Sequence, residues 1–407
     1  MDIGLVILGA AALLLRAGFG LYTSGSLRAK NGASAVLRIT ADTAVSSLVF
    51  WVIGAAILFQ TANGFFAVDM HSLFGRLPQF ADSEFFHLSI ILIGGAIGAG
   101  VLAERTRFYV GMVLSALLAG FIVPVAGHWA WTGWLNDHGF IDTGGASVIH
   151  LSAAVCAAVA ALFVGPRVGK YNKDGSSNSI PGHALSLSSI GVLLLLAAWF
   201  PYLLGCAITH PPVTESSNDP TFAMAAMNII LAASAGALAG LVYGQFRYGK
   251  PDVFFTYTGL LAGLVAISAG VTTMGNIGAV ITGAIAGLIV PLLMLEVDRQ
   301  GKLDDPIGAV SIHGIGGIWG TLAVALFAPT DFHHRLAMAG IQAVGIASIV
   351  VLSAIASIVV VLILKLAGPL RVTDPDEQDG LDIGEHDING YPDFQQTTIK
   401  SYHLREA

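Results

Sequence analysis

The sequence predicts an all-α polytopic membrane protein with eleven transmembrane helices, and three observations support that class. The 407 residues are 55% hydrophobic and only 11% charged, with a mean hydropathy of +0.76, whereas soluble domains carry about 25% charged residues. Eleven apolar runs are each long enough to cross a bilayer. The basic residues between these runs also alternate along the chain, as they do when a chain crosses a membrane repeatedly.

The apolar runs define the expected helices in chain order. The first run has no basic segment before it, so we interpret it as a span rather than as a signal peptide. The second, eighth and ninth runs are rich in glycine, alanine and threonine, and their assignment depends on the polar segments beside them. We expect the spans at residues 3–25, 35–59, 85–103, 108–127, 143–164, 184–207, 222–244, 254–272, 275–296, 307–328 and 338–366.

Basic side chains collect in every second connecting segment. One set of segments carries eleven basic residues, and the alternating set carries two, Arg76 and Arg335. Basic segments stay on the cytoplasmic side, so we expect a cell (inner or plasma) membrane protein with its N-terminus outside and its C-terminus in the cytoplasm. The eleven residues are Arg28, Lys30, Arg105, Arg107, Arg167, Lys170, Lys173, Arg247, Lys250, Arg299 and Lys302.

Two segments with one pattern begin long apolar runs. DTGGASVIH spans residues 142–150 and DPIGAVSIH spans residues 305–313, so each places an aspartate eight residues before a histidine. An aspartate is suited to cap a helix, and eight residues advance about 12 Å along it, which places His150 and His313 near the bilayer midplane. An ionisable residue at that depth is a candidate functional group. The alternative is a buried structural histidine with a hydrogen-bond partner.

The two histidine-bearing helices are the fifth and the tenth in the series. Five crossings separate them, so they run in opposite directions through the membrane. This indicates an inverted repeat of helices 1–5 and 6–10, with the eleventh helix added. Opposed helices of this kind can bring the imidazoles of His150 and His313 together at the midplane.

Other polar residues within the apolar runs have a structural interpretation. Arg16 and Asp42 lie inside the first two spans and must face protein or water rather than lipid. The two cysteines, Cys156 and Cys206, lie in separate apolar runs and provide no disulfide framework. No set of histidine, cysteine and carboxylate residues has metal-ligand spacing. We therefore expect no metal, no cofactor and no enzymatic activity.

The composition changes after Leu370. Residues 371–407 carry nine acidic and three basic side chains and few apolar ones, which predicts a membrane domain at 1–370 and a cytoplasmic tail at 371–407. The formal net charge of −7 comes largely from this tail. It indicates no partner by itself, and we expect no nucleic-acid partner.

Eight segments in order make the chain resemble the ammonium transporter family, the Amt/Mep/Rh proteins, over nearly its whole length. The resemblance implies eleven helices, an outside N-terminus, a homotrimer with one pore per subunit, and transport of ammonium or ammonia. It also implies regulation by a trimeric PII-type protein. The segments are LRAKN (27–31), AERTRF (103–108), GHWAW (127–131), DTGGASVIH (142–150), GPR (165–167), IPGH (180–183), RYGKPD (247–252) and DDPIGAVSIHGIGGIWGTLAVALF (304–327).

The family's site residues fall on matching positions of this chain. His150 and His313 resemble the twin pore histidines. Asp142 resembles the acidic residue that holds the binding site in shape, and Trp131 resembles the vestibule tryptophan that faces ammonium. Trp199 matches the tryptophan of the family's GWFGFNxGS stretch.

That stretch and the helix opposite it depart from the family pattern. AWFPYLLGC, from Ala198, has Tyr202 where the family has its second phenylalanine and Cys206 where the family has the binding-site serine. The two stacked phenylalanine positions fall at Phe86 and Ile90, so the inner ring is missing. We therefore expect substrate-binding residues and pore residues as follows: Trp131, Asp142, Cys206, Phe86 and Trp199 for binding; His150, His313, Ile90 and Tyr202 for the pore.

Two function classes remain open after this comparison. Transport of ammonium or ammonia through a twin-histidine pore is favoured. The alternative is an ammonium sensor on the same scaffold, which binds ammonium, conducts little, and signals through a module on its C-terminal side. The tail departs from the family too, because GLDIGEHDINGY (380–391) has Asp387 and Ile388 where the resembled GLDxxxHGExAY has glycine and glutamate.

Overall fold

The computed structural model describes residues 3–60, 65–66, 68, 73–74, 81–211 and 221–392. Arg76 and the end of the predicted tail, residues 393–407, lie outside this part of the chain. Eleven helices in the described part are long and apolar enough to cross a membrane, which confirms the predicted number. They are Ile3–Ser26, Ala29–Leu58, Ala81–Val101, Phe108–Asp137, Ala146–Val164, Leu185–Thr209, Phe222–Tyr248, Val253–Gly270, Asn276–Arg299, Val310–Phe327 and Phe332–Ala367.

Several spans consist of more than one helical segment, and four of them contain a π-helix, here η2, η5, η6 or η7. The elements in chain order are α1 (Ile3–Ala12), α2 (Leu14–Ser26), η1 (Ala29–Asn31), α3 (Gly32–Val49), η2 (Phe50–Gly54), α4 (Ala55–Leu58), α5 (Ala81–Val101), α6 (Phe108–Leu117), η5 (Leu118–Ile122), α7 (Val123–Trp131), α8 (Trp134–Asp137), η6 (Ala146–Leu151), α9 (Ser152–Val164), α10 (Leu185–Thr209), α11 (Thr221–Tyr248), α12 (Val253–Gly270), α13 (Asn276–Arg299), η7 (Val310–Ile315), α14 (Gly316–Phe327), α15 (Phe332–Ala367), α16 (Asp374–Asp379) and α17 (Leu381–Gly384).

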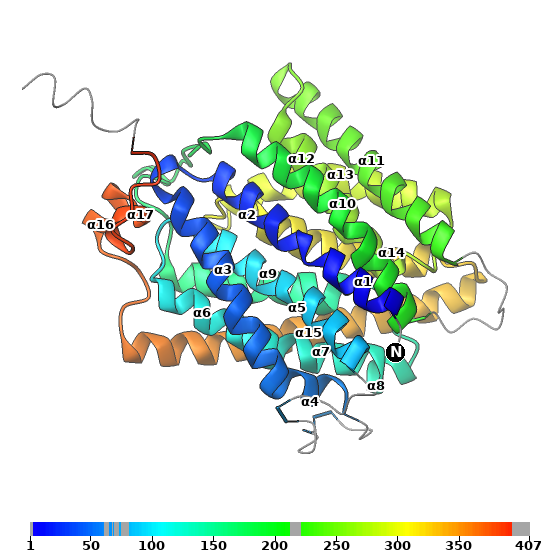
Figure 1. Cartoon of the computed structure of the whole chain (residues 1–407). Helices are drawn as coiled ribbons and strands as arrows, with labels where there is room; N and C mark the ends of the chain where they lie inside the picture. The colour runs from blue at the N-terminus through cyan, green and yellow to red at the C-terminus, as the bar shows by residue number, and fades with distance from the viewer. Residues whose placement is uncertain are drawn as a thin grey trace, which may run out of the picture.

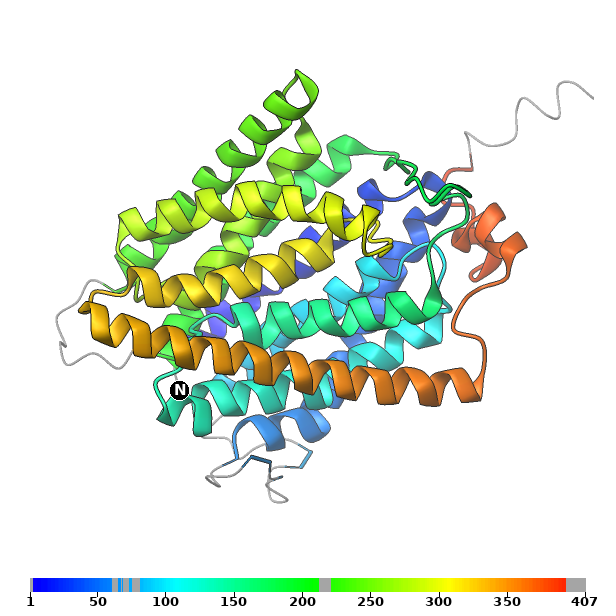
Figure 2. The same cartoon turned by 180° about the vertical axis from the view of Figure 1, so that it is seen from behind.

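The long helices form one bundle. The N-terminal end of α1 lies at one end of this bundle, and the tail helices α16 and α17 lie at the other end (Figure 1). An odd number of spans produces this separation. The eleventh span, α15, runs along the outside of the bundle beside α9 and α14 (Figure 2).

Close helix packing in α11, α12 and α13 depends on glycine. A Cβ atom on Gly236 would lie 2.3 Å from the carbonyl oxygen of Gly259, and one on Gly287 would lie 2.2 Å from the carbonyl oxygen of Gly236. Real Cβ atoms do not approach so closely, so these glycines allow three backbones to meet. This packing supports the half of the bundle that carries His313.

The charged residues inside the first two spans pair with each other. The guanidinium of Arg16, on α2, forms an ion pair with the buried carboxylate of Asp42, on α3. It also donates to the carbonyl oxygens of Ile39, at 2.7 Å, and Leu92. Leu92 belongs to α5, so one buried cation joins three spans.

Breaking this pair should destabilise the protein strongly. Replacing Asp42 with asparagine leaves the Arg16 charge buried without its counter-ion, a change that typically costs about 3–5 kcal/mol. Replacing Thr43 with valine is the matched control, because it removes no charge and only two hydrogen bonds, the one from Arg16 at 2.9 Å and the one to the carbonyl oxygen of Ile39 at 2.7 Å, each worth about 1 kcal/mol. Thermal unfolding in detergent should show a large drop for D42N and a small one for T43V; equal drops would contradict the assignment.

A second group of buried charges joins four connecting segments at the tail end of the bundle. The carboxylate of Glu104 accepts hydrogen bonds from Asn31 and Arg167 at 2.8 and 2.6 Å. Arg167 also donates from Nε and Nη2 to the carboxylate of Asp304, both at 2.8 Å. Arg105 donates to the carbonyl oxygen of Asp304 at 2.7 Å. These residues lie in the segments with the basic excess, so they order the face of the bundle that carries those segments.

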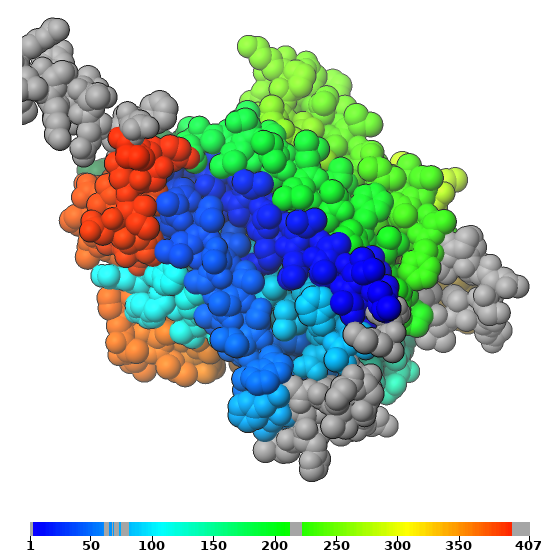
Figure 3. Space-filling model, in the orientation of Figure 1, coloured from blue at the N-terminus to red at the C-terminus, as the bar shows by residue number. Residues whose placement is uncertain are grey.

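The tail packs on this face. The carboxylate of Asp382 accepts the N–H groups of Ala33 and Ser34 at 3.1 and 2.7 Å, at the start of α3. The carboxylate of Glu385 accepts the N–H of Phe108, the first residue of α6, at 2.8 Å and pairs with Arg38. Helix N-termini favour such carboxylates. The tail therefore covers the ends of two spans, and Figure 3 shows it as a patch beside them.

One position of the tail at which this chain departs from the family pattern keeps the backbone conformation that favours glycine. Asp387 stands where the resembled family has glycine, and its φ of 52° lies in the left-handed region. Aspartate tolerates this region better than most residues. Downstream, the hydroxyl of Tyr391 lies 2.6 Å from Nε2 of His183, in the loop before α10. The whole segment 380–391 is therefore docked despite the two replacements.

Acid should weaken the buried charge network in a defined pH window. Burial alone would raise the pKa of Asp304, but hydrogen bonds from Arg167 and the charges of Arg105 and Arg167 lower that pKa from 3.8 to about 2. A depressed carboxyl pKa stabilises the fold above the unfolded value, and this contribution disappears as pH falls from about 4 to about 2. The thermal midpoint of the wild type should exceed that of D304N above pH 4, and the difference should shrink below it. Asp137 is exposed and lies outside this network, so D137N is the control variant.

Candidate functional site

Both predicted aspartates cap the segments that carry the histidines. The carboxylate of Asp142 accepts the N–H groups of Ala146, Ser147 and Val148 at 2.7, 2.8 and 2.9 Å. Asp305 accepts the N–H of Val310 at 2.6 Å in the equivalent place. Each carboxylate thus satisfies the free donors of a helix start inside the bundle.

The two histidine segments share a local geometry that the sequence pattern did not reveal. His150 lies in η6 and His313 lies in η7, and both segments are π-helices that continue as α-helices. Single π-helical turns are frequent at functional sites because the wider turn redirects a side chain. The shared irregularity agrees with an origin of the two halves as an inverted repeat.

The structure brings His150 and His313 together. Their Nδ1 atoms lie 3.1 Å apart, and their rings are nearly parallel, with centroids separated by 4.9 Å. His150 is fully buried and His313 is 3% exposed. The pair therefore lies in the interior of the bundle, where hydrocarbon and protein exclude water.

Aromatic side chains surround the pair. Trp199 stacks on His150 with ring centroids 5.3 Å apart, and Phe19 of α2 lies 6.0 Å from His313. The hydroxyl of Tyr202 donates to the carbonyl oxygen of Gly144 and lies 3.4 Å from Nε2 of His150. Phe19 was missed by the sequence analysis, because a phenylalanine in the first span has no distinguishing signal.

These contacts define one neutral tautomer for each ring. The tyrosine proton is committed to Gly144, so the oxygen of Tyr202 accepts from Nε2–H of His150. Nδ1 of His150 then accepts from Nδ1–H of His313. Among the described residues, Nε2 of His313 has no hydrogen-bond partner, so its lone pair is available. The hydrogen bonds within the pair and to Tyr202 therefore form with both imidazole rings neutral.

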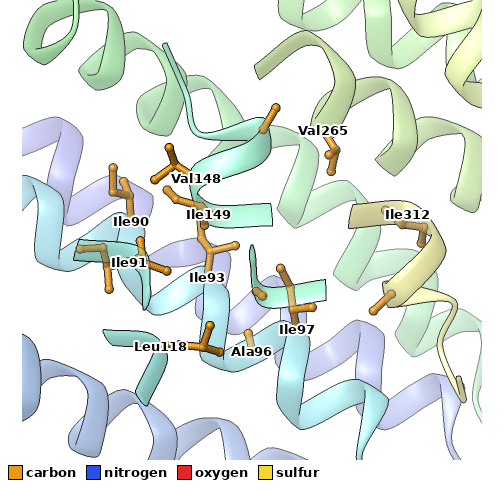
Figure 4. Close-up of a cluster of buried hydrophobic side chains, with 14 of the residues drawn as sticks. Ile90, Ile91, Ile93, Ala96, Ile97, Leu118, Val148, Ile149, Val265 and Ile312 are labelled. Atoms are coloured by element: carbon orange, nitrogen blue, oxygen red, sulfur yellow. The ribbon is translucent and has the colours of Figure 1, made fainter. Parts of the chain in front are cut away.

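A cluster of buried aliphatic side chains forms a further wall in the interior of the bundle. Ile90 is fully buried on α5, and Figure 4 shows it near Val148 of η6, in a cluster that extends to Val265 of α12 and Ile312 of η7. Ile90 stands at the position where the resembled family has its inner phenylalanine. An apolar wall of this kind favours a neutral species over a charged one.

Three of the predicted binding residues, Trp131, Phe86 and Cys206, lie around the C-terminal end of α10, whereas Trp199 lies against His150. Nε1 of Trp131 donates to the carbonyl oxygen of Asp142 at 2.8 Å. Phe86 is fully buried against Gly205, where an added Cβ would lie 2.0 Å from its ring. Cys206 is also fully buried, beside Gly205 in α10.

Two further histidines complete this outer region, and the sequence analysis missed both. His210 stacks on the ring of Trp131 with centroids 4.0 Å apart, so one face of that tryptophan is covered. The Nε2 atoms of His210 and His87 lie 3.0 Å apart. A usable signal was present, because His87 follows Phe86 directly and His210 follows Cys206 by one helical turn.

The described residues contain no group of three or more histidine, cysteine, aspartate and glutamate side chains placed to hold a metal ion. The arrangement instead offers aromatic faces, neutral imidazoles and an apolar wall. Such groups suit a small hydrogen-bonding molecule that is a cation on one side of the site and neutral on the other.

The eleven-span bundle, with ionisable groups paired in its interior, defines a multi-pass membrane protein. The comparisons with known proteins identify the group within that class. The sequence model of the Ammonium Transporter Family matches residues 4–391. The chain therefore belongs to the ammonium transporter family.

Named relatives and solved structures agree with this assignment. Ammonium transporter Amt2 of Archaeoglobus fulgidus is 32% identical over 96% of this chain and 87% of its own length. Ammonium transporter Amt1 of Haloferax mediterranei is 32% identical over 96% of this chain and 79% of its own length. A solved structure named Sensor Amt Protein matches with a TM-score of 0.88 and 31% identity over 94% of this chain and 97% of its own.

Proposed function

We propose that this protein transports ammonium or ammonia across the cell membrane through a pore lined by His150 and His313. The observation that carries the proposal is the buried, neutral histidine pair at the meeting point of the two repeats. Membership of the ammonium transporter family and the names of the relatives support the same substrate.

The chemistry of the substrate fits the change in surroundings along the site. A bare ammonium ion is very costly to desolvate in an apolar medium, and ammonia is not. Outside, aromatic rings such as Trp131 and Phe86 favour a cation by roughly 0.5–2 kcal/mol. Inside, the free lone pair at Nε2 of His313 accepts an N–H, and the aliphatic wall around Ile90 admits the neutral form. The site thus favours separation of the proton from the nitrogen.

The second candidate is an ammonium sensor, and one contact favours it. In a conducting pore both outward nitrogens of the histidine pair would serve the substrate. Here the hydroxyl of Tyr202 lies against Nε2 of His150 and removes that nitrogen from the path. The similarity to a structure named Sensor Amt Protein and the docked tail support the same candidate, in which the C-terminal side passes on the signal.

A current measurement and a binding measurement on the same preparation distinguish the two functions. The protein is reconstituted into liposomes on a solid-supported membrane, and an ammonium pulse is applied. Transport predicts a sustained current that grows with protein density, whereas sensing predicts binding with only a brief charge displacement. The absence of both binding and current in folded protein would overturn the proposed function.

The orientation and the assembly belong to the same proposal. We infer an outside N-terminus and a cytoplasmic C-terminus in a cell membrane, supported by the eleven-to-two division of basic residues between alternating segments. We also infer a homotrimer, with a PII-type regulator or a signalling module as its cytoplasmic partner, as the family resemblance implies. Reporter fusions at both ends and the mass of the complex in nanodiscs test these inferences.

Removing the docked tail segment should alter the ammonium response. A chain that ends after Asp379 loses the caps that Asp382 and Glu385 provide for α3 and α6. Coupling between a regulatory element and a site is commonly about 1–3 kcal/mol, which corresponds to a change of roughly fivefold or more. We expect a change of that size in the current or in the apparent ammonium affinity. A chain that ends after Pro392 retains every described contact and is the control; equal behaviour of both chains would contradict coupling.

A further inference from the structure

The outer histidine pair, His87 and His210, differs from the inner pair in the number of protons that its ring nitrogens must carry. Nδ1 of His87 lies 2.7 Å from the carbonyl oxygen of Ser83, and Nδ1 of His210 lies 3.0 Å from the carbonyl oxygen of Thr143. A carbonyl oxygen only accepts, so each Nδ1 must carry a proton. Each neutral ring would then present a lone pair at Nε2.

Those two lone pairs face each other. The Nε2 atoms lie 3.0 Å apart, a hydrogen-bond distance that two bare acceptors do not adopt, because their lone pairs repel. The contact therefore requires one proton between the rings, which makes the pair a single cation. The inner pair has no such requirement, because Tyr202 and Gly144 set its tautomers.

The surroundings suit a cation of this size. The ring centroids of Phe59, Phe86 and Trp131 lie 5.0, 5.7 and 5.8 Å from that of His87. Aromatic faces stabilise a partly desolvated cation. His87 is buried, and His210 is half-buried at the end of α10, so the cation is reachable from one side.

We propose that His87 and His210 form the outer recognition site for ammonium, in which ammonium replaces the shared proton. This inference rests on the proposed ammonium-binding function. The exchange is balanced: the protonated pair and one ammonium ion give the neutral pair with bound ammonium and one released proton. Two N–H groups of the ammonium ion donate to the two Nε2 atoms.

The same acceptor pair explains selectivity against potassium. Potassium is similar in charge but donates no hydrogen bonds, and it prefers several oxygen ligands. Two imidazole lone pairs fixed by backbone carbonyls instead require a donor on each side. Two hydrogen bonds of about 2.9 Å to one tetrahedral nitrogen hold the Nε2 atoms about 4.7 Å apart, so binding must separate the rings.

Other ionisable groups lie on the elements that carry or contact the pair. These groups are Asp82 and Glu84 on α5, His128 on α7, Asp142 before Thr143, and Tyr202 and Cys206 on α10. The carboxylate of Asp142 is directed to the N–H groups of η6. It therefore serves the inner segment and not the outer pair.

Isothermal titration of the purified trimer with ammonium chloride tests the exchange. Measurements in two buffers of different ionisation heat give the number of protons released for each ammonium ion bound. We expect about one proton, and a fall in apparent Kd of about tenfold per pH unit over the range in which the pair is protonated. Potassium chloride should produce neither binding heat nor proton release.

Glutamine variants of the two histidines test whether this pair is the group that releases the proton. His87→Gln and His210→Gln should each abolish the proton release and weaken ammonium binding by about tenfold. His138→Gln is the matched control, because exposed His138 makes the same Nδ1 contact with a backbone carbonyl, that of Trp134, at 2.7 Å. It should behave as the wild type does.

The outcomes separate this inference from the proposed function. Ammonium binding by the wild type without proton release, or with release that both glutamine variants retain, would overturn the outer site and leave the proposed function intact. No ammonium binding by folded wild-type protein would overturn both. The two-buffer measurement needs no variant, so a misfolded variant does not weaken the test.

Discussion

Replacing His313 with alanine should lower the ammonium-evoked current by about a hundredfold. A positioned proton-transfer group typically contributes about 10²–10⁴-fold to a reaction, and His313 offers the free lone pair of the inner pair. Without it, the nitrogen meets only an aliphatic wall, and the remaining Nδ1 of His150 loses its donor. The current is measured on solid-supported membranes at matched protein density.

Two controls separate an effect on transport from misfolding of the variant. His138→Ala changes an exposed histidine and should leave the current unchanged. Size-exclusion profiles and thermal midpoints of H313A must match the wild type, because an alanine at a buried site leaves a cavity. An unchanged current in folded H313A would remove the inner pair from the proposed path and with it the single strongest argument for transport.

Hydropathy and charge were sufficient to predict how many times the chain crosses the membrane and where it does so. Most spans begin and end within about six residues of their predicted positions, because crossing a bilayer requires a minimum length of apolar helix. The fourth was predicted to end at residue 127 and continues to Asp137. The repeated spacing of Asp142 with His150 and of Asp305 with His313 then predicted which residues lie in the interior. Opposed helices made the meeting of the two imidazoles a reasonable expectation.

Contacts that depend on rotation about a helix axis could not be predicted in the same way. The pairing of Arg16 with Asp42 needed the relative rotation of two spans, which hydropathy does not determine. His87 and His210 are separated by 123 residues, and neither lies in a repeated motif. The π-helical turns also escaped prediction, because one extra residue in a turn leaves no clear mark on an apolar sequence.

The second large expected effect concerns Tyr202, whose hydroxyl is a departure of this chain from the family pattern beside His150. Replacing Tyr202 with phenylalanine removes one oxygen atom and frees Nε2 of His150 for the substrate. A hydrogen bond of this kind contributes about 1 kcal/mol, and competition with the substrate adds to it, so we expect the current to rise about tenfold. Restoring the second ring at Ile90 would be a poorer test, because a larger side chain overpacks a fully buried site.

Tyr22→Phe is the control for that experiment. The hydroxyl of Tyr22 also donates to a backbone carbonyl, that of Ile307, at 2.9 Å, but within the described part of the chain it forms no hydrogen bond with His150 or His313. Y22F should lose stability comparably and leave the current unchanged. A tenfold rise in Y202F with unchanged ammonium affinity would show that the tyrosine restricts conduction after binding, as a sensor requires. An unchanged current in Y202F would contradict this, because substrate would then pass His150 without using the nitrogen that Tyr202 covers.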